Sequence, residues 1–195
     1  MFNYIFNIYY LIGFFSGSAI RIWYGRKHKQ EKLAIFHTEG LAVGLLACLW
    51  GIAILLPLFY MFTDWLSFAD YNLPAWAGFI GIAAFTVAIW LLWRSHYDLG
   101  RNWSTTVEIK NGHTLVIGGI FNYIRHPMYA AHLLWGIAQI LLIHNWIAGL
   151  ASLIIMIPLC MLRIPFEEKE LLKQYGDEYR QYMNKTGRVI PRFSR

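Results

Sequence analysis

Long stretches without a charged side chain divide this chain, and polar segments that hold every basic residue separate them. Residues 1–20, 41–62, 73–93 and 126–162 contain no Asp, Glu, Lys or Arg. A helix needs about 20 apolar residues to cross a hydrocarbon core of ~30 Å. Only helices and closed barrels satisfy their backbone groups in lipid, and runs of this length indicate helices. The sequence therefore predicts an all-α, polytopic integral membrane protein.

The last uncharged stretch is too long for one helix, and His144-Asn145 interrupts it. It predicts a hairpin of two shorter spans. Basic residues follow the first stretch instead of preceding it, so we expect an uncleaved anchor and not a signal peptide. Five transmembrane helices result, at about 1–20, 41–62, 73–93, 128–143 and 146–162.

The basic residues orient these spans. Residues 21–37 carry five of the 17 Lys and Arg, residues 94–125 carry four, and the segment from Arg163 onward carries eight. The connections 63–72 and 144–145 carry none. The positive-inside rule then predicts an external N-terminus, with the C-terminus and the functional site in the cytosol. Membrane topology explains the net charge of +6, so we expect no nucleic-acid partner.

Two pairs of glycines have the GxxxG spacing, Gly13 with Gly17 and Gly40 with Gly44. In lipid this spacing lets helix backbones approach closely. We expect packing between spans one and two of the same chain. Dimerisation is the alternative, and the oligomeric state stays open.

The segment before span four contains several features typical of a ligand site. Gly118-Gly119 predicts a bend at which backbone can approach a ligand. Pro127 favours a helix that begins at His126-Pro127, because its missing N–H would have no helical partner there. The first amides of that helix and the side chain of Arg125 would attract a carboxylate.

The segment after span five offers a second set of polar groups. Arg163 and Glu167 are four residues apart, which places them on one helix face. Gly176 is expected to end that helix, and Asp177 to cap a short helix that carries Tyr179 and Tyr182.

Each of these features also has a simpler interpretation. Taken alone, Arg125 is reasonable as a flanking charge. Arg163 and Glu167 are reasonable as a surface ion pair, and residues 168–170 as a solvated helix face. We favour the solvated interpretation for Lys169. Together, however, the ends of a short hairpin would bring these groups to one membrane face. His126 and His132 are six residues apart, which does not suit a helical pair of metal ligands, so no metal site is expected.

Two motifs resemble a known family. Gly112-His113-Thr114-Leu115-Val116 precedes Arg125-His126-Pro127-Met128-Tyr129, and Arg163-x-x-x-Glu167-Glu168 precedes Gly176-Asp177-Glu178-Tyr179. In order and spacing they resemble the isoprenylcysteine carboxyl methyltransferase family over about residues 94–195. The small size and five-span layout are similar to the family's prokaryotic members.

The resemblance implies one membrane-embedded methyltransferase domain over residues 1–195, with the catalytic half at about 94–195. The C-terminal cytosolic helices and the connecting loop would form the pocket for S-adenosylmethionine, with S-adenosylhomocysteine as the product. Phe121 stands where relatives commonly have Tyr, so a ring contact is implied there, and Glu108 is the nearest polar candidate upstream. Arg163 and Glu167 are the implied catalytic residues, and Arg163 would bind the substrate carboxylate. The predicted cofactor contacts are His113, Thr114, Leu115, Val116, Phe121, Arg125, His126, Pro127, Met128, Tyr129 and Glu167.

The implied reaction is methyl transfer to the carboxylate of a prenylcysteine-like, lipophilic acceptor. The implied partners are a lipid-like or prenylated acceptor and the membrane lipid itself. Three alternatives stay open: a phospholipid or other small-lipid methyltransferase on the same scaffold, a sterol-type membrane reductase, and a non-catalytic membrane scaffold.

Overall fold

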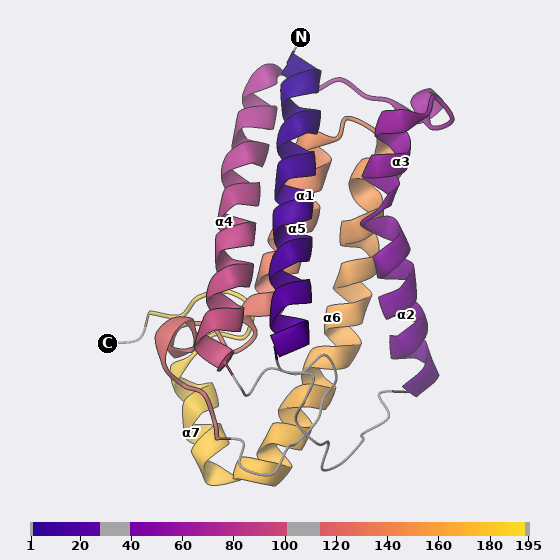
Figure 1. The fold of residues 1–195 in the computed structure, drawn as a ribbon. Coiled ribbons are helices and arrows are strands. Elements are labelled where there is room, and N and C mark those ends of the chain that lie inside the picture. The colour runs from indigo at the N-terminus through magenta and orange to yellow at the C-terminus, as the bar shows by residue number, and fades with distance from the viewer. Residues whose placement is uncertain (1, 28–39, 101–113, 194–195) are drawn as a thin grey trace.

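The computed structural model describes residues 2–27, 40–100 and 114–193, and Figure 1 shows their arrangement. Long helices run roughly alongside one another, α7 folds beneath one end of the bundle, and the C-terminal tail leaves at the side of that end (Figure 1). The helical elements are α1 (Phe2–Lys27), α2 (Gly40–Ala53), α3 (Leu56–Phe62), η1 (Ser67–Ala69), α4 (Ala75–Leu99), η3 (Gly119–Asn122), α5 (Pro127–Leu142), α6 (Trp146–Tyr175) and α7 (Asp177–Lys185).

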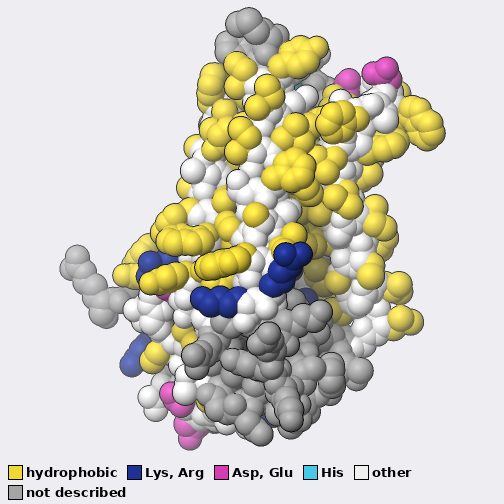
Figure 2. Space-filling model, in the orientation of Figure 1, with side chains coloured by type: hydrophobic (Ala, Val, Ile, Leu, Met, Phe, Trp, Pro, Cys, Tyr) yellow, Lys and Arg dark blue, Asp and Glu magenta, His cyan; other side chains and the backbone are white. Residues whose placement is uncertain are grey.

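The apolar helices agree with the predicted all-α, polytopic membrane fold. Four helical segments of the described chain are long and apolar enough to cross a membrane, at 3–27, 40–62, 75–99 and 146–175. The helix α5 is apolar but shorter. Hydrophobic side chains cover the flanks of the bundle, and the Lys and Arg side chains visible in Figure 2 lie toward one end. The protein is therefore an integral membrane protein.

Three helices extend beyond their predicted spans. The helix α1 continues to Lys27, so Arg21 lies on a helix and not in a loop as expected. The helix α4 ends at Leu99, and α6 runs to Tyr175 through Pro158 and Pro165. A proline removes one backbone hydrogen bond, but a membrane helix tolerates this where its neighbours satisfy the freed groups.

The second predicted span is broken near its middle. The helix α2 ends at Ala53, and α3 begins at Leu56. Pro57 lacks an N–H, and its ring would clash with the carbonyl group four residues earlier, at Ala53. The N–H of Leu55 instead bonds the carbonyl of Ile52 at 3.0 Å, and the helix restarts with Pro57 in its first turn.

The bundle buries two hydrophobic clusters. One joins α1, α4 and α5 around Tyr10, Phe85 and Trp135, and the other joins α2 and α6 around Val43 and Met156. The pair α4–α5 makes the most extensive helix contact, whereas α2 packs mainly on α6.

The expectation that the GxxxG glycines join spans one and two is wrong. A Cβ at Gly13 would overlap the ring of Phe85 on α4, and one at Gly17 would meet Trp135 on α5. A Cβ at Gly40 or Gly44 would meet no heavy atom of the described residues within 4 Å. The first pair therefore lets α1 approach α4 and α5, because those two helices carry the large rings that need the space.

The α5–α6 turn confirms the predicted hairpin break. Asn145 caps α6, because its Oδ1 accepts hydrogen bonds from the N–H groups of Ile147 (3.1 Å) and Ala148 (2.9 Å). Its Nδ2 donates to the carbonyl of Leu66 (2.6 Å) and to Asp70 (2.8 Å). This buried side chain ties the loop before α4 to the hairpin and fixes how α6 leaves the turn.

The two glycine pairs should respond differently to the same substitution. We expect Gly13→Ala to lower the free energy of unfolding by about 1–3 kcal/mol, because the added methyl group overpacks the α1–α4 contact. Gly44→Ala should be neutral or stabilise by up to about 1 kcal/mol, since alanine is the better helix former in open space. Thermal unfolding in detergent measures both variants against the wild type. Equal destabilisation of both would contradict the packing described here.

Candidate active site

The polar end of the hairpin is built by the part of α6 that continues past its apolar section. Residues 163–175 lie beyond the uncharged stretch. Gly176 then adopts a φ of 52°, in the left-handed region where glycine is favoured, and the chain reverses into α7. Gly176 bounds both helices, so Asp177 lies in the first turn of α7 and not at the predicted cap position. Tyr179 and Tyr182 lie on α7 as expected and are buried.

The C-terminal tail holds the segment that precedes α5. The N–H groups of Arg125 and His126 donate to the carbonyls of Gly187 (2.8 Å) and Arg188 (2.9 Å). The N–H of Gly187 donates in turn to the carbonyl of Tyr123 at 3.1 Å. Ile124 and Gly187 form a parallel β-bridge. The tail therefore satisfies backbone donors at the entry to α5 and fixes the direction in which that helix begins.

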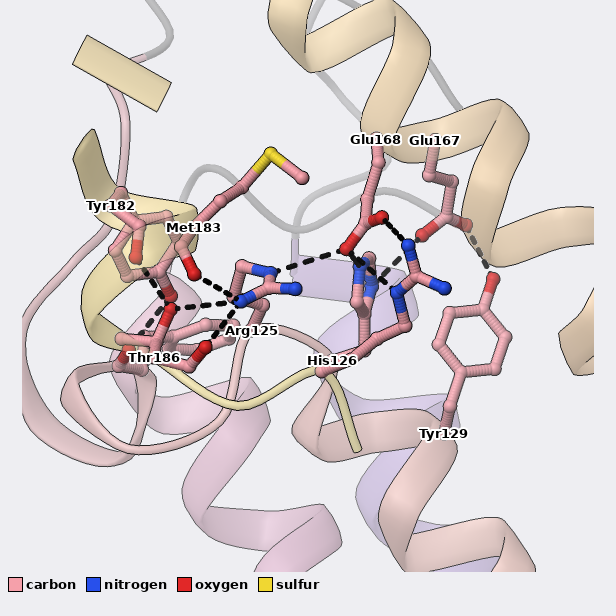
Figure 3. Close-up of polar contacts among 10 residues, drawn as sticks. Arg125, His126, Tyr129, Glu167, Glu168, Tyr182, Met183 and Thr186 are labelled. Carbon is pink, nitrogen blue, oxygen red and sulfur yellow. Dashed lines mark hydrogen bonds and ion pairs between the residues drawn. The ribbon is translucent and has the colours of Figure 1, made fainter. Parts of the chain in front are cut away.

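Glu168 is the centre of the polar network drawn in Figure 3. Its carboxylate is 3% exposed and accepts from Arg125 Nε (3.1 Å) and Arg188 Nε (3.2 Å), with His126 Nε2 at 3.3 Å. Burial raises the pKa of this carboxyl group, but the hydrogen bonds from His126, Arg188 and Arg125 outweigh burial and lower the pKa to about 2. The solvated-face interpretation is therefore wrong for Glu168, and also for Glu170, which is 4% exposed, whereas Lys169 is exposed as expected.

Arg125 links Glu168 to α7 and the tail. Its Nη1 donates to the carbonyl of Met183 at 3.0 Å and to the carbonyl of Thr186. The guanidinium is buried, with 8% of the side chain exposed. A predicted contact between Arg125 and a ligand stays a prediction. The structure gives this side chain a positioning role between three elements.

Glu167, the preceding residue on α6, faces a different set of groups. Arg163 Nε lies 3.2 Å from its carboxylate, His126 Nδ1 lies 3.5 Å away, and the hydroxyl of Tyr129 donates to it. Its side chain is 19% exposed, so this carboxylate keeps access to the outside of the protein. The predicted shared helix face of Arg163 and Glu167 is confirmed.

His126 connects the two carboxylates. Its Nδ1 faces Glu167 and its Nε2 faces Glu168, as Figure 3 shows. Burial lowers the pKa of the imidazole, but the hydrogen bonds and negative charges of Glu167 and Glu168 outweigh burial and raise it. An imidazole with an acceptor on each nitrogen is stable as the cation, because both nitrogens then donate. His126 thus lies buried between two carboxylates that favour its charged form.

The other predicted contacts lie on the connection that leads to α5. Pro127 occupies the first turn of α5 as predicted, and Met128 follows it, half-buried. Thr114 is exposed, and Leu115 and Val116 are half-buried. His113 and Glu108 lie outside the described residues.

The Gly-Gly bend is fixed from two sides. Asp98 on α4 accepts from the N–H of Ile120 at 2.7 Å and from Arg94 Nε at 2.9 Å. Phe121 is 7% exposed, and its carbonyl accepts from the hydroxyl of Tyr182 at 2.7 Å. Gly119 has a φ of 62° and lies against Asp98, so a side chain at this position would be both strained and obstructed.

Sequence reasoning missed the tail residues Thr186 and Arg188. They lie in a coil of eight residues. A coil has no periodicity from which the contacts of its side chains could be predicted. Adjacent acids at 167–168 gave a partial signal, since helical geometry separates consecutive side chains by about 100° and sends them to different partners. In the described ranges, no group of three or more His, Cys, Asp or Glu is placed to hold a metal ion.

Replacing the central carboxylate tests the network. We expect Glu168→Gln to reduce the free energy of unfolding by about 3 kcal/mol or more, since it leaves buried cations without their counter-charge. The folded-state pKa of about 2 lies below the ordinary value of 4.5, so the ionised form stabilises the fold above pH 4.5. That stabilisation, and hence the difference from the variant, should decrease as the pH falls from 4.5 toward 2.

Thermal unfolding across this pH range, in detergent, measures the effect. Glu178→Gln is the matched control, because it removes the same charge from an exposed side chain on α7. A variant at position 168 with wild-type stability at neutral pH would contradict the network's structural role.

Comparison with known proteins relates this site to a family. A sequence model described as the isoprenylcysteine carboxyl methyltransferase (ICMT) family matches residues 80–173. The protein-S-isoprenylcysteine O-methyltransferase of Schizosaccharomyces pombe is 33% identical over 94 residues, which cover 47% of this chain and 40% of the yeast protein. The Arabidopsis thaliana protein-S-isoprenylcysteine O-methyltransferase A is 24% identical over 73% of each chain.

The Homo sapiens protein-S-isoprenylcysteine O-methyltransferase is 25% identical over 66% of this chain and 49% of its own length. The chain thus spans less than half the length of the S. pombe and human proteins that it matches. The matched residues 80–173 include both ends of the α5–α6 hairpin, and with them Arg125, His126, Tyr129, Arg163 and Glu167. Through this segment, the chain is similar to the isoprenylcysteine carboxyl methyltransferase family.

Proposed function

We propose that this protein is an S-adenosylmethionine-dependent methyltransferase that esterifies the carboxylate of a prenylcysteine-like, lipophilic acceptor. One observation carries the proposal. Arg163, Glu167, His126 and Tyr129 come from opposite ends of a hairpin and meet within contact distance at the edge of its apolar section. These residues also lie in the segment that matches the family.

We further propose that this end of the bundle faces the cytosol. The hairpin turn and the connection 63–72 at the other end carry no Lys or Arg, whereas the site end carries them in abundance. A difference of this kind orients membrane proteins with the basic end inside. A water-soluble cofactor would then arrive from the cytosol, and a lipid-borne acceptor would arrive from the bilayer.

The residues around Glu167 fit the chemistry of S-adenosylmethionine. The partly exposed carboxylate of Glu167 suits the ammonium group of the cofactor, and the ring of Tyr129 suits a sulfonium or an adenine. Residues 117–119 are exposed, and a Cβ at Gly118 would meet nothing within 4 Å. Their backbone can therefore approach a ligand closely. Thr114, Leu115, Val116, Phe121 and residues 126–129 are the remaining described candidates for cofactor contacts.

The proposed reaction does not require the protein to transfer a proton. Bound S-adenosylmethionine supplies an electrophilic methyl group, so that an acceptor carboxylate oxygen forms the new C–O bond as the C–S bond breaks and a thioether leaves. A carboxylate is already ionised at neutral pH, so no general base is needed. The residues of the chain therefore contribute by binding and orienting the acceptor, which can supply several kcal/mol of the barrier reduction.

Arg163 is the proposed group that holds the acceptor carboxylate. Its planar guanidinium matches carboxylate geometry, and its contact with Glu167 at 3.2 Å fixes where that charge lies. The side chain is 18% exposed and follows directly after the uncharged part of α6. In the low-dielectric surroundings expected at a membrane boundary, the attraction between the guanidinium and a carboxylate is stronger than in bulk water.

We expect Arg163→Ala and Glu167→Ala each to reduce methyl transfer by about 100-fold or more, as is typical when one positioned charge is lost from an active site. Transfer of labelled methyl from S-adenosylmethionine to a prenylcysteine analogue measures the effect. Lys169→Ala is the matched control, because Lys169 is exposed on the same helix. Wild-type turnover in both variants would contradict the site assignment.

Calorimetry can separate the two roles. We expect Glu167→Gln to weaken the binding of S-adenosylhomocysteine by about 10-fold, because a charge-assisted contact is lost. Arg163→Lys should leave that affinity unchanged and raise the KM for the acceptor, since lysine keeps the charge but not the planar fork. Competition between an aminolipid and the prenylcysteine analogue would contradict the proposed acceptor. A protein that binds no S-adenosylhomocysteine would contradict the proposed cofactor.

A further inference from the structure

Arg21 is a charged residue that the proposed reaction does not yet use. It lies on α1, and its Nη1 is 3.0 Å from His132 Nε2 on α5. The opposite nitrogen of that ring, Nδ1, is 2.6 Å from the carbonyl of Met128. A carbonyl only accepts, so Nδ1 carries the proton, and the neutral ring leaves Nε2 as an acceptor for Arg21.

His132 is well placed to orient the guanidinium of Arg21. The imidazole is 5% exposed, and the indole of Trp50 on α2 packs edge-on against it, with ring centroids 4.8 Å apart. The ring therefore cannot turn freely. This contact fixes the position of the arginine's charge but does not neutralise it.

The charge of Arg21 has no acidic partner among the described residues. Its hydrogen bond goes to a neutral imidazole. His132 follows Tyr129 by three residues on α5, and the hydroxyl of Tyr129 donates to Glu167, the carboxylate that pairs with Arg163 on α6. The positive charge of Arg163 acts on Arg21 from this side. Two guanidiniums on different helices thus act on one region of the bundle. An arrangement of this kind is costly near the bilayer core, and such ionisable groups are generally functional there.

Both arginines lie at the same boundary of the apolar region. Arg21 is the first charged residue after the uncharged stretch 1–20, and Arg163 is the first after 126–162. His132 is five residues into α5, about 7–8 Å along the helix axis from Pro127. Arg21 therefore lies on the membrane side of His126 and Glu167. A carboxylate on a lipid-like molecule would meet this depth first, whereas a cofactor from the cytosol would meet Glu167 first.

We propose that Arg21 binds the carboxylate of the acceptor together with Arg163, and that α1 thereby contributes a residue to the acceptor site. This inference rests on the proposed function. His132 acts as the positioning residue for Arg21. Two guanidiniums around one carboxylate would hold it in a fixed orientation, and loss of that negative charge on esterification would weaken the hold on the methyl ester product.

The test compares the binding of an acid with the binding of its ester. The affinity of detergent-solubilised protein for a prenylcysteine analogue is measured beside its affinity for the methyl ester of the same compound. We expect the wild type to prefer the acid, and Arg21→Gln to reduce this preference by about 10-fold or more, as loss of a hydrogen bond to a charged group would. The affinity for S-adenosylhomocysteine should not change.

Arg26→Gln is the matched control, because Arg26 is exposed in the last turn of α1. If Arg21→Gln does not fold, Arg21→Lys replaces it, and a smaller loss of acid preference is expected because the charge remains without the planar fork. Weakening of acid and ester alike would overturn the proposal, since that result indicates a packing role. So would an unchanged acid preference.

The two hypotheses fail in different ways. If the wild type methylates the analogue and the Arg21 variant keeps the full preference for the acid, only the role of Arg21 is overturned. A wild-type protein that transfers no methyl group but shows an Arg21-dependent preference for the acid overturns only the proposed reaction. A wild-type protein that neither transfers methyl nor distinguishes acid from ester overturns both.

Discussion

The buried carboxylate of Glu168 is the constraint on which the cytosol-facing end of our proposed topology depends. It receives charged donors from the segment before α5 and from the C-terminal tail, while it is itself carried on α6. Apolar packing holds the helices along their uncharged stretches. Beyond that level, hydrogen bonds and charge pairs join the buried rings of Tyr179 and Tyr182 in holding the chain. Removal of this carboxylate would leave Arg125 and His126 as buried cations, which is far more costly than never having buried them.

The two adjacent acids, Glu167 and Glu168, have different roles at this end. Consecutive residues of a helix point about 100° apart, so Glu168 turns into the protein while Glu167 stays partly exposed. His126 contacts both and couples the interior pair to the outward one. The position of the proposed ligand-binding carboxylate is thus set by a neighbour that no ligand reaches. We infer that Glu168 fixes Glu167 through shared backbone and shared imidazole, without a part in the chemistry.

The sequence predicted those features that depend on local chemistry. Uncharged runs indicated the helices, Pro127 marked the start of α5, Gly176 marked the reversal after α6, and the spacing of Arg163 and Glu167 indicated their contact. It did not predict features that depend on partners distant in the chain. Glu168 is buried because Arg188, in the C-terminal tail, contacts it. The glycines of α1 pack on rings of α4 and α5, and no spacing rule identifies those rings. Three helices also continue past their uncharged stretches, because a helix can extend beyond its last apolar residue wherever long basic side chains can reach water.

The balance of charge at this end argues for an anionic ligand. Glu168 contacts Arg125, Arg188 and His126, and Glu167 contacts Arg163 and His126. Arg21 contacts the ring of His132. In these contacts four cations share two carboxylates, with His126 between both, and Arg21 adds a positive charge beside a neutral imidazole. Near a low-dielectric boundary such an excess of positive charge is unfavourable until an anion arrives. An acceptor carboxylate meets that need only before methylation, because the ester is neutral. The same excess that would draw in the substrate would therefore favour release of the product, without any movement of the helices.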